Sequence, residues 1–170
     1  RPYRPLYNGK PVELAGYFQA GDDSNFIALT SEFRENFPFA VIFHEYVHFL
    51  TKDLTSKCPV WVAEGLAEYY STFEMSDGDR KVWLGKPIAN HLLLLRQEKI
   101  LPLSVLLTVT HDSPYYNEKS KQGIFYAESW ALVHMLLSGA PDRSAELSKY
   151  VRAASAGVPA ETAWRDAFGS

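Results

Sequence analysis

The chain has 170 residues, 14% of them aromatic, and a formal net charge of −3. This length can bury one hydrophobic core, and the aromatic content argues against a disordered chain. The slight negative charge, without a cluster of basic residues, gives no reason to expect nucleic acid as a partner.

The single cysteine, Cys58, excludes an internal disulfide, and we interpret it as a small, inert residue. Apolar runs such as residues 92–95 are far too short to span a bilayer. The chain begins at Arg1 without a methionine, which indicates an excised or processed fragment. Nothing in the sequence indicates the oligomeric state.

Two strands are predicted near the N-terminus, over residues 12–19 and 25–30, because the turn-forming residues Gly-Asp-Asp-Ser lie between them. They predict a small antiparallel or mixed sheet over about residues 10–32. The second strand could offer an edge that pairs with an extended peptide.

Two helices are predicted next, over about residues 37–54 and 60–73, and Pro59 is a typical residue at the start of the second. A short connection joins the two helices, so we expect them to form a hairpin that brings their side chains together.

The remaining chain is predicted to be mainly helical. Asp77-Gly78 first indicates a β-hairpin, with arms at residues 72–75 and 81–84. Polar and turn-forming residues over 110–123 indicate a long loop. The expected helices cover about residues 88–97, 103–107, 124–138, 143–154 and 159–168.

The segment from His44 to His48 has the form H-E-x-x-H. Because an α-helix has 3.6 residues per turn, positions i and i+4 share a face, so both histidines can bind one metal ion. Glu45 lies roughly 100° further round the helix, where it can reach a metal-bound water but is not placed to be the next ligand. The pattern predicts two zinc ligands and one general base.

Apolar residues flank this motif at 39–43 and 49–50, which is typical of a buried helix. Burying two histidines and a glutamate is costly unless they bind something. The alternative is a core helix whose polar residues satisfy one another.

The second helix is expected to supply the third ligand. The longer motif H-E-x-x-H-x-x-G-x-x-H is excluded, because Thr51 and Leu54 occupy its Gly and His positions. Two glutamates, Glu64 and Glu68, lie four residues apart on one face of the second helix. We predict Glu64 as the ligand and Glu68 as the acceptor for the N–H of one metal-binding histidine. The alternatives are that Glu68 is the ligand, or that it is a solvated glutamate.

These two helices resemble those of the gluzincin metallopeptidases. The segments His44-Glu45-x-x-His48 and Trp61-x-x-Glu64-Gly65-Leu66-Ala67-Glu68-Tyr69 are similar to the paired motifs of bacterial peptidase-MA-like domains. The strong part of the resemblance covers residues 38–74, and the G-x-M-E-N motif of the aminopeptidase branch is absent. The resemblance implies a zincin-like fold, a peptide or protein substrate, and a secreted or periplasmic location. In thermolysin-like members the residue four beyond the glutamate ligand orients a zinc-bound histidine, which implies the same role for Glu68.

Tyr126 is the predicted donor to the negative charge that develops on a carbonyl oxygen during hydrolysis. It begins an apolar helix directly after the predicted loop, and this helix also resembles a later helix of the peptidase-MA-like family. Tyr115 and Tyr116 in the loop are rivals, and an ordinary core or surface tyrosine is the alternative.

The other histidines are interpreted more simply. His91 and His134 lie in apolar helical patterns and are expected to be packed or edge histidines. His111, in the predicted loop, could stabilise the transition state. Glu128 could contact substrate or stabilise the helix start, and it is left unassigned.

The sequence therefore predicts one α+β domain over residues 1–170. A small N-terminal sheet precedes the metal-binding helices, over about 37–74, and a mainly helical part over about 87–170.

The expected activity is zinc-dependent hydrolysis of peptide bonds. His44, His48 and Glu64 would hold Zn²⁺ and leave a fourth position for water, which Glu45 would deprotonate. Two alternatives remain: a catalytically idle zinc- or peptide-binding module on the same fold, and a helical interaction domain with an accidental motif.

Overall fold

The computed structural model describes residues 39–55, 58–76, 78 and 80–169, together with the backbone of four short strands nearer the N-terminus. These strands form two antiparallel pairs: β1 (Leu6–Tyr7) with β2 (Lys10–Pro11), and β3 (Gly16–Gln19) with β4 (Phe26–Leu29). In the second pair Gly16 lies opposite Leu29 and Gln19 lies opposite Phe26. The remaining parts of the predicted strands, including residues 12–15, lie outside the described residues.

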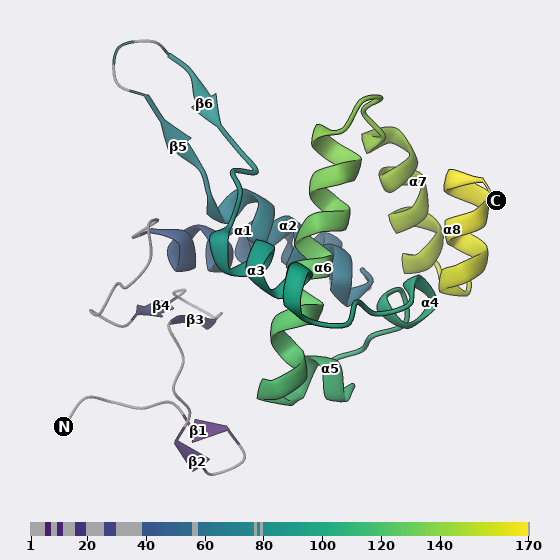
Figure 1. Cartoon of the computed structure of the whole chain (residues 1–170), viewed down its shortest axis with the longest axis horizontal. Coiled ribbons are helices and arrows are strands. Elements are labelled where there is room, and N and C mark those ends of the chain that lie inside the picture. Colours follow the sequence, from purple (N-terminus) through teal and green to yellow (C-terminus); the bar gives the residue numbers. More distant parts are fainter. Residues whose placement is uncertain are drawn as a thin grey trace.

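The rest of the described chain is helical apart from one hairpin (Figure 1). The helices are α1 (Ala40–Thr55), α2 (Val60–Ser71), α3 (Ala89–Gln97), α4 (Leu103–Leu106), α5 (Pro114–Asn117), α6 (Lys119–Ser138), α7 (Ser144–Ser155) and α8 (Ala160–Phe168). The predicted α+β class, with small strand pairs followed by a mainly helical part, is confirmed. Both β3 and β4 lie beside α1.

The hairpin consists of β5 (Glu74–Met75) and β6 (Val82–Trp83), as Asp77-Gly78 predicted. It projects away from the helices, and both strands are exposed (Figure 1). Gly78 at its tip has a φ of 94°, a left-handed conformation that glycine adopts without strain.

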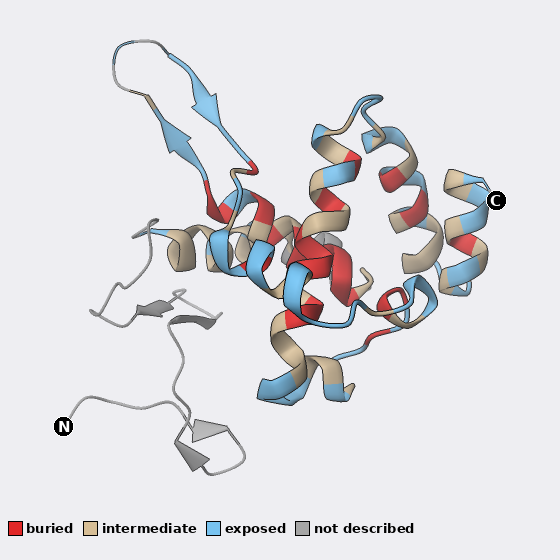
Figure 2. Ribbon diagram, viewed as in Figure 1, coloured by how far each residue is buried: buried red, intermediate tan, exposed pale blue. Residues whose placement is uncertain are grey.

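The contact between α2 and α6 forms the centre of the helical part. Gly65 of α2 lies directly on α6: a Cβ at this position would be 2.4 Å from the carbonyl oxygen of Ser129 and 2.6 Å from Cγ2 of Val133. Both distances are far below van der Waals contact, so this approach of the two helices requires a glycine. Figure 2 shows that buried residues gather where these helices cross.

An aromatic cluster connects α2 to the C-terminal helices. Trp61 is fully buried, and its indole N–H donates a hydrogen bond of 3.1 Å to the hydroxyl of Tyr150 on α7. Trp164 and Phe168 of α8 complete the cluster, with ring centroids 4.2 Å apart. The ring of Trp164 lies 6.1 Å from that of Trp61. Hydrophobic burial therefore anchors the N-terminal end of α2.

The loop predicted over residues 110–123 is confirmed for residues 110–113 and wrong for most of the rest. Residues 114–117 form α5, and α6 begins at Lys119 rather than near residue 124. Pro114 suits the first position of a helix, where its missing N–H is not needed. The first turn of α6 is polar and partly exposed, so its composition resembles that of a loop. Tyr126 consequently lies well inside α6 and not at a loop–helix junction.

Candidate metal centre

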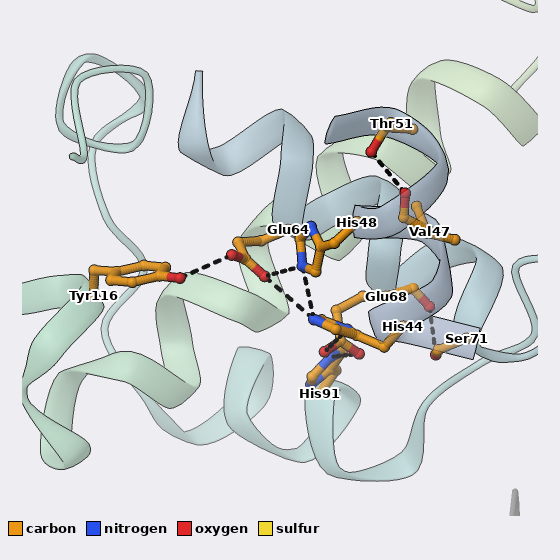
Figure 3. A network of polar contacts seen from close by, with 9 residues as sticks. All are labelled: His44, Val47, His48, Thr51, Glu64, Glu68, Ser71, His91 and Tyr116. Carbon is orange, nitrogen blue, oxygen red and sulfur yellow. Dashed lines mark hydrogen bonds and ion pairs between the residues drawn. The ribbon is translucent and has the colours of Figure 1, made fainter. Parts of the chain in front are cut away.

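His44 and His48 lie one turn apart on α1, and their Nε2 atoms are 3.1 Å from each other. Helix α2 packs against α1 and brings Glu64 to this pair (Figure 3). Its Oε2 atom lies 3.4 Å from Nε2 of His44 and 3.3 Å from Nε2 of His48. The structure thus brings together the three residues that the sequence predicted as zinc ligands.

The triangle of these three ligand atoms has the size that a tetrahedral metal site requires. With metal–ligand bonds of about 2.0–2.1 Å, two ligands of a tetrahedron lie roughly 3.3 Å apart. The observed edges of 3.1, 3.3 and 3.4 Å match one face of such a tetrahedron. One cation can therefore contact all three atoms and keep a fourth position open.

One carboxylate oxygen of Glu64 faces the two histidines, and the other accepts a hydrogen bond. Its side chain is 4% exposed, and its Oε1 accepts a hydrogen bond of 3.1 Å from the hydroxyl of Tyr116. Oε2 is buried, and it lies within ion-pair distance of Nε2 of His44 and of His48 without a hydrogen bond of good geometry from any described residue. A buried carboxylate oxygen without a well-formed hydrogen bond is costly, and a bound cation would satisfy it. The arrangement favours binding through one oxygen.

The charges of the cluster also favour a cation. Burial lowers the pKa of His44, but hydrogen bonds with Glu64 and Glu68 outweigh burial and raise it to about 10. Burial raises the pKa of the Glu64 carboxyl, but the close contacts and charges of His44 and His48 outweigh burial and lower it to about 2. The carboxylates thus favour a positive charge at the imidazoles, and a bound metal ion can supply it instead.

Glu68 lies behind His44, away from the ligand triangle. Its Oε1 is 3.2 Å from Nδ1 of His44, while its Oε2 is 3.0 Å from Nε2 of His91 (Figure 3). This position suits an acceptor for the second N–H of a metal-binding histidine and does not suit a ligand. The predicted division between Glu64 and Glu68 agrees with this geometry.

Glu45 follows His44 on α1 but does not belong to the ligand triangle. It is partly buried, and its negative charge is felt at Tyr116. Burial, the charge and hydrogen bond of Glu64 and, more weakly, the charge of Glu45 raise the pKa of Tyr116. Glu45 is therefore near enough to Tyr116 for its charge to act on that hydroxyl.

Two tyrosines border the centre. Tyr116 of α5 and Tyr126 of α6 stack with ring centroids 6.3 Å apart, and the Tyr126 ring lies 6.4 Å from that of His44. Burial raises the pKa of each hydroxyl. Both groups therefore stay protonated and able to donate. The polar contact with Glu64 belongs to Tyr116, which the sequence offered as a rival of Tyr126.

The remaining candidates have different environments. His91, predicted as a packed or edge histidine, is buried and hydrogen-bonded to Glu68. His134 packs between the rings of Tyr69 and Trp130, as a packed histidine should. Glu128 accepts a hydrogen bond of 2.6 Å from the backbone N–H of Leu101.

Tyr115 and His111 contact residues outside the ligand triangle. Tyr115 lies under the ammonium group of Lys121, 6.0 Å from its ring centroid. His111 is exposed, and its ring lies 4.9 Å from that of Tyr116. Among the described residues, the only group with the spacing of metal ligands is that of His44, His48 and Glu64.

A model of the family described as "Protein of unknown function (DUF1570)" matches residues 38–161. The chain belongs to the DUF1570 family. The DUF1570 match begins just before α1 and extends into α8, so it includes every residue of the metal centre. Neither a curated protein nor a solved structure matches the chain. No described helix is long and apolar enough to cross a membrane.

Proposed function

We propose that this DUF1570 protein is a zinc-dependent peptidase of the gluzincin type. The observation that carries the proposal is the triangle of His44, His48 and Glu64, which has the dimensions of a tetrahedral zinc site. Glu45 adjoins this triangle on the same helix, at the position where the H-E-x-x-H pattern places a general base. A site built only to store metal would not need this carboxylate.

Zinc is the metal that this centre suits best. Two imidazoles and one carboxylate can also hold iron in oxygenases, so the donor set alone leaves two candidates. Both histidines come from one helix turn and the glutamate from the next helix, as in zinc hydrolases. Glu45 supports hydrolysis, because an oxygenase has no need of a general base beside the metal.

The residues of the centre divide the work of hydrolysis. When bound, zinc supplies Lewis-acid chemistry, which polarises a carbonyl group and acidifies water. Glu45 accepts the proton of the attacking water and passes it to the leaving amine. The hydroxyls of Tyr116 and Tyr126 are the donors within reach of the centre for the developing oxyanion. Tyr126 is the predicted donor. The Tyr116 hydroxyl has a single proton, which it donates to Glu64, so Tyr116 can serve only by exchanging that hydrogen bond for one to the oxyanion.

A peptide in extended form is the substrate that we expect. Among the described strands β4 pairs with β3 alone, and both strands lie beside α1. The free edge of β4 suits the addition of a peptide strand, which would orient a scissile bond over the centre.

Metal analysis tests whether the chain binds zinc through the proposed ligands. Protein purified without added metal should contain about one zinc per chain, because three side chains define one site. The His44→Ala and Glu64→Ala variants should lose most of it, whereas His134→Ala, outside the centre, should retain it. Full zinc in both ligand variants, or iron in place of zinc, would contradict the proposal.

A conservative variant tests whether Glu45 acts as the general base of peptide hydrolysis. Glu45→Gln keeps the size and hydrogen bonding of the side chain but cannot accept a proton. We expect normal zinc content and cleavage of a peptide library reduced at least ~100-fold, the usual scale for loss of a general base. Glu98→Gln, on the exposed surface, is the matched control. If the wild-type protein holds zinc but cleaves no peptide, the alternative of an idle zinc-binding module is correct.

A further inference from the structure

His91 is joined to the metal centre through Glu68. The two oxygens of the Glu68 carboxylate each contact one histidine: Oε1 lies 3.2 Å from Nδ1 of His44, and Oε2 lies 3.0 Å from Nε2 of His91 (Figure 3). The contact spans 23 positions of sequence and links α3 to α2. A continuous chain of polar contacts thus runs from His91 to a proposed ligand.

The geometry fixes where the protons lie. If Nε2 of His44 binds zinc, Nδ1 must carry the proton and donate it to Glu68. Nε2 of His91 faces the same carboxylate, so it must carry a proton too. In neutral His91 the other ring nitrogen is then a bare acceptor, and Nδ1 is indeed buried without a hydrogen-bond partner among the described residues. Such an atom costs stability, so packing alone would favour an apolar residue here.

The surroundings show why Glu68 needs a second contact. A solvent-open pocket of about 480 Å³ lies beside it and is also lined by Asn90, Lys119 and Gln122. Water or the Lys119 ammonium group would compete for a carboxylate that only His44 held. His91 is well placed to prevent this movement, because its buried ring packs 5.8 Å from the ring of Trp130.

We propose that His91 is a positioning residue, which holds Glu68 against Nδ1 of His44 and so fixes the tautomer and orientation of that metal ligand. The inference rests on the proposed metal site. It requires no catalytic contact of its own, since His91 acts through Glu68.

The test uses substitutions that keep or remove a donor. His91→Gln places an amide N–H close to the position of Nε2, whereas His91→Asn is one bond shorter and His91→Leu has no donor. His134→Leu is the matched control, because His134 also packs on Trp130, with ring centroids 5.3 Å apart, but takes no part in the chain. The zinc affinity of each folded protein is measured by competition with a chromophoric chelator. The His44 Nδ1–H resonance of the zinc-loaded protein is followed by NMR.

We expect His91→Leu to weaken zinc binding about tenfold, the lower end of the range for residues that support a ligand indirectly. The His44 Nδ1–H resonance should shift or broaden in the same variant. His91→Gln should restore most of the affinity, His91→Asn should not, and His134→Leu should resemble wild type. A merely structural role would lower the melting temperature without this pattern.

Three outcomes would overturn the inference. In the first, His91→Leu binds zinc as tightly as wild type with an unshifted resonance. In the second, which decides the matter if His91→Leu does not fold, the Gln and Asn variants have equal affinity. In the third, the wild-type protein binds no zinc, and the proposed function fails as well.

Discussion

Helix α2 contributes to two regions that differ in whether a buried polar atom has a hydrogen-bond partner within the protein. In the aromatic cluster of Trp61, Tyr150, Trp164 and Phe168, the indole N–H of Trp61 has a partner in the Tyr150 hydroxyl at 3.1 Å. In the candidate metal centre, one turn further along, the buried Oε2 of Glu64 meets two imidazoles at 3.3 and 3.4 Å but has no hydrogen bond of good geometry from any described residue. Protein groups alone therefore satisfy the cluster, whereas we have proposed that a metal ion completes the centre.

The largest effect is expected from removal of the cluster's anchor. Trp61→Ala leaves a cavity in the core, so we expect it to lower the free energy of unfolding by about 3–5 kcal/mol, measured by urea denaturation. Trp83→Ala is the control, because Trp83 is 51% exposed on the hairpin and should cost less than about 0.5 kcal/mol. Equal losses would show that the cluster does not anchor α2.

Removal of zinc should have the next largest effect. A metal that binds the folded chain alone stabilises it by about 2.7 kcal/mol when its free concentration is 100 times Kd. Chelation should therefore lower the melting temperature of wild type. The His44→Ala variant, which cannot hold the metal, should not respond to chelator. Unchanged stability of wild type after verified zinc loss would mean that the centre, like the aromatic cluster, is stable without a bound metal.

Gly65→Ala should perturb both regions, because it forces α2 away from α6. The added Cβ would collide with the carbonyl oxygen of Ser129, which is backbone and cannot give way. We expect a loss of about 1–3 kcal/mol and weaker zinc binding, since Glu64 is the neighbouring residue. Gly123→Ala is the control: its Cβ would lie 3.2 Å from the flexible Leu94 side chain, so it should be neutral or slightly stabilising.

The smallest expected effects come from two single hydroxyls. Tyr150→Phe leaves the Trp61 N–H unpaired and should cost about 1 kcal/mol of stability without changing zinc affinity. Tyr116→Phe removes the donor to Glu64, so it should change zinc affinity and lower kcat more than it raises KM. If both variants behaved alike, the distinction between the two regions would disappear.

The sequence was sufficient to predict those features of the molecule that depend on a few neighbouring residues. The spacing of His44 and His48 placed both side chains on one helix face, and Asp77-Gly78 placed the hairpin, because each depends on a few neighbouring residues. Glu64 could be found because the second helix follows the first after a short connection.

The features that the sequence did not predict depend on packing between segments that are distant in the sequence. Polar composition at residues 119–123 belongs to a partly exposed helical turn and does not mark a loop. Which of the ten tyrosines contacts Glu64 could not be predicted, because the contact of Tyr116 depends on the position of α5 relative to α2. His91 lies in an apolar pattern, and nothing local indicates that its Nε2 meets Glu68, on a helix that precedes the hairpin.

The four tryptophans make the molecule its own optical reporter. Trp61 and Trp130 are 0% and 5% exposed and Trp164 is partly buried, whereas Trp83 on β6 is 51% exposed. Aqueous iodide should therefore quench the red-shifted emission of Trp83 first and leave the emission of the helical part. Any molecule that covers the hairpin should protect this fraction from quenching, so its arrival is measurable on the unlabelled protein.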